Sequence, residues 1–510
     1  MGAVSLSLTK DRFCEEARGG VIPPLYTEIP YLAPHEVYPA FAGPGSLLFE
    51  SIKGPEKISR FSFLAFAPYA SFKVKDSVVE LESRGRRAVS TKRRPLDRLK
   101  ELVKIYRQRP LPELPPFQGG AAGLFCYDFV NYFEKISVSP DMPKDDLGLP
   151  EAFFFMFDRL IAFDRFAGKA WIIFCPGTRE TGLGYGDISG LDWKEKYAEA
   201  EGAVNGIAAK LKSFPPRANP PGPARGIPSI NIEHGITRER YMEMVARAKE
   251  YIAAGDIFQA NLSLRVHSPT GDADPWTIYS VLRNVNPAPF ASFADFGGFQ
   301  IASSSPERLI KLHNGVVETR PIAGTRPRGA DSAGDEAMRR ELLLNDKERA
   351  EHIMLIDLER NDLGKVSDYG SVRVDELMTT EDYSHVIHIV SNVCGRLVKG
   401  RDMFDCLRAA FPGGTITGVP KVRCMQIINE LEPARRGPYT GGVGYMGFSG
   451  SMDFNILIRT FLLKDGMAYV QAGAGIVADS VPEREYIESM RKAEALIQTL
   501  DMVKKGCVHI

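Results

Sequence analysis

The chain has 510 residues, of which 44% are hydrophobic and 25% charged, as in a globular protein with a substantial core. Its length suggests two or three domains, or one large interwoven unit. Basic and acidic residues number 64 each. This balance argues against nucleic acid or a membrane surface as a partner and favours a role in small-molecule chemistry.

The sequence also carries no signal for export or membrane insertion. No apolar run approaches the roughly 18 residues of a transmembrane helix, and no basic region followed by an apolar one marks a signal peptide. The seven cysteines are scattered without a C-x-x-C pair, which suggests free thiols in a reducing compartment. We therefore expect a cytoplasmic protein without a disulfide framework.

The clearest boundary is a proline-rich segment at residues 214–228, "FPPRANPPGPARGIP", with the composition of a stiff, exposed linker. Residues 1–213 alternate β-branched and aromatic runs, such as "SFLAF", "AFFFMF" and "AWIIF", with turn clusters, so this N-terminal region should be rich in strands. Residues 229–510 mix helical and strand patterns. We expect most of the distinctive chemistry in this second region.

Two amphipathic helices are predicted after the linker. The segment "TRERYMEMVARAKEYIAAG" begins with a capping threonine, Thr237, and ends at Gly255. Residues 336–366 form a second helix, with a possible break. Combined with the strand runs of the first region, these helices predict an α+β fold.

Two glycine patterns imitate nucleotide-binding motifs, at residues 442–447 and 473–478. A dinucleotide fingerprint lies between a strand and a helix. Here the strand-like run "MDFNILIRTFLL" follows the first pattern, and a polar loop with Pro482 follows the second. "GGTITGVPK" lacks the Gly-Lys-Ser/Thr of a P-loop. We therefore expect neither a dinucleotide site nor an ATP site.

The segment Glu318–Gly329, "ETRPIAGTRPRG", is predicted to be a loop that holds an anion, because it is rich in arginine, glycine and proline. Its glycines, with those of "FPGGTITG" and "AGAG", leave backbone N–H groups unobstructed and suited to cradling carboxylates. Arg459 lies in the apolar run "LIRT", which we expect to be a strand and where an unpaired guanidinium would be costly. It forms either an internal salt bridge or a bidentate carboxylate clamp.

Two helical segments carry glutamates at the same spacing. Glu348 and Glu351 are three residues apart on one helix face, and Glu485 and Glu488 repeat the spacing, with Lys492 one turn further on. Either pair alone is typical of a solvated helix face. If the helices meet across a cleft, the glutamates could hold Mg²⁺, which takes one or two carboxylates plus substrate and water oxygens. The spacing leaves both interpretations open.

A family resemblance emerges from motifs that occur in this order: "DIFQANLS", "SSSPERL", "RPIAGTRPRG", "AEHIMLIDLERNDLG", "YSHVIHIVSNV", "FPGGTITGVPK", "GGVGYMGFSGSMDFNILIRT" and "QAGAGIVADSVPEREYIE". The sequence resembles the chorismate-utilising enzymes, namely the large subunits of anthranilate synthase and aminodeoxychorismate synthase. The resemblance covers about residues 230–500 and reaches the N-terminal region through "LLFESIKGPEKISRFSFLAFAP" and "GGAAGLFCYDFV". It implies an α+β fold: a large antiparallel β-sandwich flanked by helices, with the active site between its layers.

The same resemblance implies roles for individual residues. Mg²⁺ would be bound by four glutamates, the first two directly and the last two in support: Glu351, Glu488, Glu348 and Glu485. Glu307 would be the general acid that helps the ring hydroxyl leave, and His388 would lie near the enolpyruvyl side chain. Chorismate would be held by Gly324, Thr325, Thr415, Tyr445, Arg459, Gly473, Ala474, Gly475 and Lys492.

One position separates the chemistries of the resembling enzymes. Those that add water to chorismate have a lysine where this chain has Gln259, because water needs a base. Ammonia is already nucleophilic, so Gln259 as the third catalytic candidate implies amination. This chain shows no glutaminase-like nucleophile elbow. We therefore expect a separate glutamine amidotransferase subunit to dock and deliver ammonia.

The product of amination is a close choice. With alanine at position 323, the chain resembles anthranilate synthases. Many aminodeoxychorismate synthases have at this position a lysine that attacks the ring. The segments "QANLS", "NPAPF", "DLERNDLG" and "FPGGTITG", and Asn455, resemble aminodeoxychorismate synthases, some of which also lack that lysine. We favour 4-amino-4-deoxychorismate, a folate precursor, over anthranilate plus pyruvate. A third hypothesis is an inactive scaffold for the amidotransferase, against which the intact acidic and basic site residues argue.

A regulatory site is a further possibility. "LLFES" and "PAPFAS" resemble the elements that form a tryptophan pocket in anthranilate synthases, although Phe290 replaces the usual tyrosine. The possible tryptophan site would comprise Glu50, Ser51, Pro289, Phe290 and Ala291. The alternative is an apolar core site, and the sequence favours neither.

Overall fold

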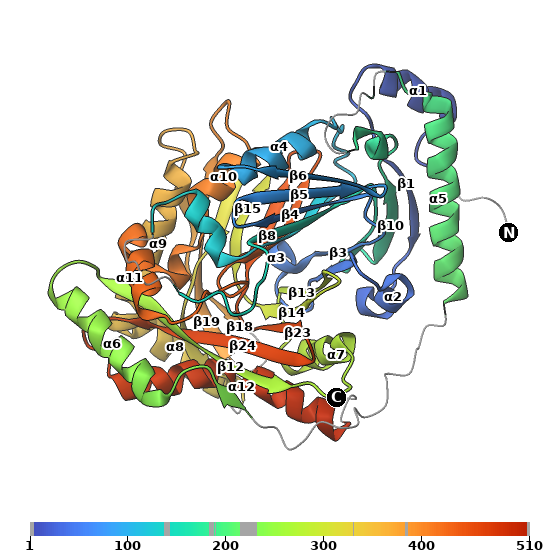
Figure 1. Ribbon diagram of the computed structural model, residues 1–510. Coiled ribbons are helices and arrows are strands. Elements are labelled where there is room, and N and C mark those ends of the chain that lie inside the picture. Colours follow the sequence, from blue (N-terminus) through green and yellow to red (C-terminus); the bar gives the residue numbers. More distant parts are fainter. Residues whose placement is uncertain are drawn as a thin grey trace.

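The computed structural model describes residues 5–136, 143–182, 188, 190–214, 232–329, 331–382 and 386–506. Within these ranges the strands form two twelve-stranded sheets in which neighbouring strands are antiparallel. Figure 1 shows the sheets at the centre of the molecule with helices around them. The predicted α+β fold, a large antiparallel β-sandwich flanked by helices, is confirmed.

The first sheet contains β1 (Leu25–Pro30), β2 (Leu47–Glu50), β3 (Phe61–Ala65), β9 (Arg159–Asp164), β10 (Lys169–Phe174), β11 (Glu233–His234), β12 (Gln259–Pro269), β13 (Phe290–Asp295), β14 (Gln300–Ser305), β20 (Gly418–Val419), β23 (Thr460–Lys464) and β24 (Met467–Ile476). Their order is β1-β10-β9-β3-β2-β13-β14-β23-β24-β12-β11, and β20 pairs with β12.

The second sheet contains β4 (Ala70–Lys75), β5 (Val78–Ser83), β6 (Arg86–Thr91), β7 (Gly120–Phe125), β8 (Ala152–Phe157), β15 (Arg308–His313), β16 (Val316–Arg320), β17 (Ile322–Pro327), β18 (Arg373–Asp382), β19 (Val386–Arg396), β21 (Gly442–Gly447) and β22 (Met452–Ile456). Their order is β17-β19-β16-β15-β22-β21-β7-β8-β4-β5-β6, and β18 pairs with β19.

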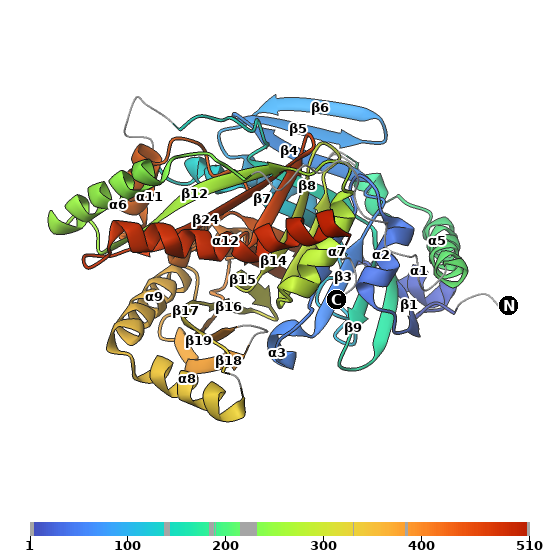
Figure 2. The same cartoon turned by 90° about the horizontal axis from the view of Figure 1, so that it is seen from below.

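The helices are α1 (Lys10–Arg18), α2 (Pro34–Phe41), α3 (Glu56–Ser59), α4 (Pro95–Lys104), α5 (Trp193–Ser213), α6 (Arg238–Ala253), α7 (Pro275–Val285), α8 (Ser332–Leu344), α9 (Asp346–Gly364), α10 (Met403–Ala410), α11 (Lys421–Leu431) and α12 (Pro482–Lys505), with the short 3₁₀ turns η1 (Tyr127–Tyr132), η2 (Thr178–Thr181) and η3 (Gly414–Ile416). Figure 2 shows α12 lying along the first sheet beside α6 and α7, and α8 and α9 beside β17 and β19. Helices α9 and α12 are thus attached to different sheets.

Both sheets contribute side chains to one apolar core. Leu47 and Phe63 from the first sheet are buried in the same cluster as Leu124 and Phe157 from the second. Burial of apolar area, at about 25 cal/mol per Å², is the main stabilising contribution of such an interface. In the described ranges no helix is long and apolar enough to cross a membrane, and the six cysteines there are buried and unpaired.

Strands from both sides of the proline-rich segment share both sheets. In the first sheet β2 pairs with β13, and in the second sheet β7 pairs with β21. Residues 1–213 and 229–510 are therefore interwoven, in line with the single large unit that the length also allowed. The predicted linker at 214–228 lies outside the described residues except for Phe214.

The two predicted helices are present. Thr237 caps α6, because its hydroxyl accepts a hydrogen bond from the Arg240 N–H at 3.2 Å. The expected break in the second helix falls at Asn345, between α8 and α9. The Asn345 side chain accepts from the Glu348 N–H at 3.1 Å, so it starts α9 as an N-cap.

Two backbone predictions were wrong. The segment Glu318–Gly329 is not a loop: β16 and β17 run through it, and both pair with β19. Gly324 sits at a bulge in β17 with φ +61°, a conformation that glycine adopts without strain, so the glycine re-aims a strand. Arg459 is not inside a strand either. It lies between β22 and β23 with φ +53°, which turns its side chain out of the strand alternation.

Candidate functional site

Gln259 and Glu351 meet where the first sheet faces helix α9. Gln259 begins β12, and its Nε2 donates to Glu351 Oε1 at 3.3 Å. The other polar atom of this side chain, Oε1, is buried and has no hydrogen-bond partner among the described residues. Leaving a buried acceptor unpaired costs about 1–3 kcal/mol. The position therefore fits a ligand that donates a hydrogen bond to Gln259.

The two predicted glutamate pairs come together across this site. Burial raises the pKa of Glu351, and the negative charges of Glu348 and Glu488 raise it further. Burial also raises the pKa of Glu485, and Glu488 again adds to the rise. Helices α9 and α12 thus concentrate negative charge in one place, which favours a bound cation.

Two of the four glutamates, Glu348 and Glu488, already form ion pairs. The Arg326 guanidinium forms an ion pair with Glu348, with Nη1 and Oε1 3.1 Å apart. Lys492 Nζ lies 2.8 Å from Glu488 Oε1 and donates to the Gly473 carbonyl at 3.0 Å. Glu348 is therefore balanced by an arginine, and Lys492 has to exchange a partner before it can contact a substrate carboxylate.

The donor set fits Mg²⁺ in an open site. In the part of the chain that the structure describes, no three His, Cys, Asp or Glu side chains form a ready-made metal cage. Mg²⁺ does not need one, because it keeps several waters and uses one or two carboxylates together with substrate oxygens. Glu351 and Glu488, on facing helices, would supply those carboxylates.

Arg459 is a cation without a carboxylate partner. Its Nη1 donates to the Lys492 carbonyl at 2.6 Å, and it forms no ion pair with an acidic side chain in the described ranges. Burial lowers its pKa, which the neighbouring Tyr439 and Glu488 partly offset. The internal salt bridge considered above is therefore absent there, and the guanidinium is left for an anionic ligand.

Glu307 follows β14 in the buried Ser-Pro-Glu turn and is 6% exposed. Burial raises its pKa to about 8, with Thr415 and Lys492 opposing the rise and Glu359 adding to it. The Thr415 hydroxyl beside it is buried and has no well-directed hydrogen bond among the described residues. A carboxyl group that stays protonated near neutral pH can act as a general acid.

His388 and Thr325 face each other across β17 and β19. His388 Nδ1 lies 2.9 Å from the Thr325 hydroxyl and 3.3 Å from the Gly324 carbonyl oxygen. Burial lowers the pKa of His388 to about 4, so the imidazole is neutral at neutral pH. The structure therefore places His388 as a residue that orients Thr325, and it does not support His388 as a source of protons.

The segment Gly473–Gly475 lies in a paired strand. Register pairs Gly473 with Ser263 and Gly475 with Asn261 of β12. A Cβ at Gly475 would stand 2.3 Å from Gln259 Nε2, so the glycine makes room for the Gln259 side chain. The predicted anion cradle is thus a strand surface next to Gln259, in which glycine serves close approach.

Comparison with known proteins identifies the family. A sequence profile described as chorismate binding enzyme matches residues 45–498. The chain belongs to this family. Anthranilate synthase component 1 of Acetivibrio thermocellus is 41% identical over 469 residues, which span 89% of this chain and 90% of the relative. Aminodeoxychorismate synthase component 1 of Bacillus subtilis is 41% identical over 456 residues, or 89% and 92%.

Solved structures agree with this assignment. Anthranilate synthase component I from Streptococcus pneumoniae superposes with a TM-score of 0.74 at 34% identity, and the match covers 88% of this chain and 95% of that one. The menaquinone-specific isochorismate synthase of Escherichia coli shares the fold, with a TM-score of 0.66 at 18% identity. The protein is a chorismate-utilising enzyme of the anthranilate and aminodeoxychorismate synthase type.

One substrate residue predicted for this chorismate binding enzyme is misplaced. Tyr445 stacks on Phe117, with ring centroids 4.4 Å apart, and lines a separate cavity of about 550 Å³. The tyrosine that neighbours Arg459 is Tyr439. Tyr445 lies inside β21 with its side chain toward the sheet interface, so its assignment to chorismate was wrong.

Sequence reasoning missed Tyr439. Its ring lies against the buried Arg436, whose guanidinium carbon is 5.6 Å from the ring centroid and 4.8 Å from that of Tyr127. Arg436 is itself fixed by an ion pair with Glu432, 2.7 Å between Nη2 and Oε1. The signal in the sequence was the run "EPARRGPYTGG", where charged residues and a glycine turn precede an aromatic residue.

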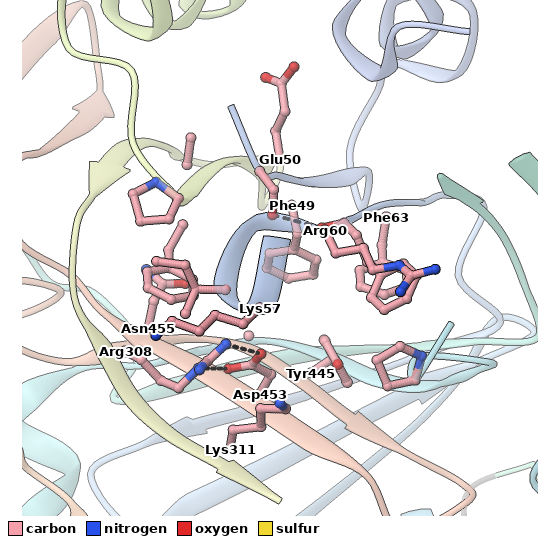
Figure 3. A pocket seen from close by; sticks show the side chains of 18 of the residues that line it. Phe49, Glu50, Lys57, Arg60, Phe63, Arg308, Lys311, Tyr445, Asp453 and Asn455 are labelled. Atoms are coloured by element: carbon pink, nitrogen blue, oxygen red, sulfur yellow. Dashed lines mark hydrogen bonds and ion pairs between the residues drawn. The ribbon is translucent and has the colours of Figure 1, made fainter. Parts of the chain in front are cut away.

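The separate cavity contains the residues of the possible tryptophan site. Ser51, Pro289, Phe290 and Ala291 line it, together with Lys57, Arg60, Lys311, Asp453 and Asn455. Figure 3 shows the Glu50 side chain directed away from the other labelled groups. The Glu50 carboxylate binds Arg283, 2.8 Å away, and Tyr279. Glu50 thus borders the cavity, while its carboxylate is held by Arg283 and Tyr279.

The reassignment of the substrate-binding tyrosine from Tyr445 to Tyr439 can be tested. We expect Tyr439→Phe to raise the KM for chorismate several-fold, because the Tyr439 hydroxyl interacts electrostatically with Arg459. Tyr445→Phe, the matched control, should leave KM unchanged because its ring packing is retained. Steady-state kinetics with ammonium salt as nitrogen source measure both. A KM that rises only in Tyr445→Phe would restore the original assignment.

Proposed function

We propose that this enzyme aminates chorismate with Mg²⁺ and ammonia to give 4-amino-4-deoxychorismate. The observation that carries the amination is the convergence of Gln259, with its unpaired Oε1, on Glu351. Overall, chorismate and ammonia give the amino product and water: a ring C–O bond breaks and a C–N bond forms. Glu307 supplies the proton with which the hydroxyl leaves as water.

Chorismate is a dianion, and the site offers separate groups for its two carboxylates. Arg459 provides a guanidinium that forms no ion pair with a described acidic side chain, and Tyr439 is close enough to influence it electrostatically. Gly324, Thr325, Thr415 and Lys492, together with the Gly473–Gly475 strand, would complete the substrate surface. Bound Mg²⁺ would neutralise a substrate carboxylate, held by Glu351 and Glu488 with Glu348 and Glu485 in support.

Gln259 supports ammonia as the nucleophile. A lysine here would be a base, whereas a glutamine amide cannot take a proton from water. Its unpaired Oε1 can accept a hydrogen bond from ammonia while its Nε2 stays bound to Glu351. We infer that ammonia is delivered by a glutamine amidotransferase subunit, since relatives of this chain are named as component 1 of their synthases.

Several sequence motifs support 4-amino-4-deoxychorismate as the product. "QANLS", "NPAPF" and "DLERNDLG", with Asn455, are typical of the aminodeoxychorismate group. The specific observation in favour of a second candidate, anthranilate synthase, is Ala323. It is buried in β17 and offers no amine for a covalent adduct. Ammonia would then attack the ring directly, whichever carbon it reaches.

The product assay decides between the two candidates. Purified enzyme is incubated with chorismate, Mg²⁺ and ammonium salt. We expect 4-amino-4-deoxychorismate, detected as 4-aminobenzoate after an added lyase acts. Anthranilate fluorescence without the lyase would assign the second candidate. Folded protein that consumes no chorismate would instead support the inactive scaffold.

We also propose that the cavity of about 550 Å³ binds tryptophan. It combines aromatic walls, such as Phe49 and Phe290, with charged groups that suit an amino acid's two termini, such as Lys311 and Asp453. Isothermal titration calorimetry with tryptophan measures this directly. Absence of binding at millimolar tryptophan would rule the site out.

A further inference from the structure

A buried carboxyl group, Glu359, lies behind the candidate active site. It is on α9, two turns after Glu351, and is 4% exposed. Its carboxyl group is bonded to the Gly414 N–H and the Thr319 hydroxyl. It forms no ion pair within 4 Å of a described basic side chain. None of the roles assigned above uses this residue.

Its neighbour Asp362 takes the nearby positive charges. Lys421 Nζ lies 2.6 Å from Asp362 Oδ2, and Lys365 Nζ lies 2.8 Å from Asp362 Oδ1. Asp362 is therefore neutralised by two lysines. Glu359 is left buried with hydrogen bonds alone, which is costly for an ionised carboxylate. Buried carboxyl groups of this kind cluster at functional sites, where their charge or their proton takes part in the chemistry.

The turn Gly414–Thr415 connects Glu359 to Glu307. Glu359 accepts from the Gly414 N–H, and Thr415, the next residue, lies beside the Glu307 carboxyl group. The turn packs tightly on α9: a Cβ at Gly414 would stand 2.2 Å from Leu358 Cδ2. Because the turn cannot move toward α9, its position is set by the Glu359 contact on one side and by Glu307 on the other.

The Thr319 hydroxyl is a weak support for the Glu359 carboxylate. It donates to the Leu309 carbonyl at 3.1 Å, and a hydroxyl has one hydrogen. The same hydroxyl also lies within hydrogen-bond reach of Glu359, where donation to the carboxylate lowers its pKa. The hydroxyl hydrogen is thus shared between the Leu309 carbonyl and the Glu359 carboxylate, and Thr319 only partly offsets the burial of Glu359.

We propose that Glu359 is a positioning residue for Glu307: it seats Thr415 against the general acid and places a second ionisable carboxyl group behind it. This inference rests on the proposed role of Glu307. Glu359 and Lys492 face Glu307, and Asp362 and Lys421 face Glu359. When Glu359 ionises it disfavours the Glu307 anion, so Glu307 keeps its proton to higher pH.

The test is the pH profile of chorismate consumption by full-length Glu359→Gln. The amide oxygen still accepts from Gly414, but the negative charge is lost. We expect the basic limb of kcat/KM to move down by about one pH unit, the size typical of one nearby charge. Above the limb, activity would then be about tenfold lower than wild type. Free ammonia, not total ammonium, is held constant across the profile.

Two further variants test whether the shift of the basic limb is caused by loss of the Glu359 charge. Asp357→Asn, on the exposed face of the same helix, should leave the profile unchanged. Glu359→Met, neutral and of similar size, gives the same reading should the glutamine variant not fold. A basic limb that coincides with wild type in a folded, neutral variant overturns the inference.

The proposed function fails in a different way. If Glu307→Gln keeps normal turnover, Glu307 is not the acid, whatever Glu359 does. If Glu307→Gln is inactive while Glu359→Gln titrates like wild type, the inference about Glu359 alone is wrong. Because chorismate loss is the readout, neither result depends on which amino product forms.

Discussion

Glu351→Gln is expected to lower Mg²⁺-dependent chorismate turnover by at least about 100-fold, since even indirect supports of a metal ligand cost 10- to 100-fold. The variant keeps the shape of the side chain and its contact with Gln259. It removes one of the two carboxylates, on α9 and α12, that are proposed to bind Mg²⁺. Turnover as a function of Mg²⁺ concentration measures the loss, and a raised Mg²⁺ requirement is expected alongside it.

The fold of Glu351→Gln should be intact, because the wild-type carboxylate is buried among like charges. Burial, Glu348 and Glu488 all raise its pKa, so removing the charge relieves repulsion. A thermal melt equal to or above that of wild type is therefore the expected control. Asp357→Asn on the same helix should have wild-type turnover. Near-normal activity of Glu351→Gln at low Mg²⁺ would exclude a metal role for this residue.

Much of the fold could be predicted because hydrophobic periodicity is local. The short apolar runs of β3, β8 and β10, bounded by turn residues, and the capped helix α6 each contain their own signal. The possible break in the second helix was also expected, although its position at Asn345 came from the structure. What the sequence could not provide was the pairing of β2 with β13 and β7 with β21, because these contacts join segments more than 200 residues apart.

The candidate site was predicted best where helices carry it. Glu348 and Glu351, or Glu485 and Glu488, share a helix face by spacing alone, and only their meeting needed the fold. Strand residues were harder, since neighbouring side chains point to opposite faces and a shift of one residue reverses them. Tyr445 and Tyr439 lie six residues apart, on and before the same strand, yet only Tyr439 neighbours Arg459.

The glycine and arginine residues of the predicted anion-binding loop misled the prediction of the backbone. The segment Glu318–Gly329 was expected to be a loop, yet β17 forms because Ile322 and Thr325 pair with β19 around a bulge at Gly324. The sequence also could not show that the Glu50 carboxylate, at the border of the cavity, is held by Arg283 and Tyr279, which lie far away in the sequence.

Glu307→Gln is expected to lower kcat by about two to four orders of magnitude, the usual contribution of general acid catalysis. In the wild type, burial raises the pKa of Glu307 to about 8, and only the protonated form donates. Activity at constant free ammonia should therefore fall as pH rises through about 8. The basic limb should be absent from the residual activity of the glutamine variant.

Thermal stability gives an independent check, because Glu307→Gln should lower the activity but raise the stability relative to wild type. Between the ordinary pKa of 4.5 and the raised value of about 8, the folded wild type holds a proton that the unfolded chain has lost. Its stability consequently falls as pH rises through that window. Glutamine does not ionise, so the melting temperature of Glu307→Gln relative to wild type should increase from about pH 5 to about pH 8. A difference that stays constant across this range would show that Glu307 is ionised in the folded protein, and an ionised carboxylate cannot be the acid that releases the ring hydroxyl.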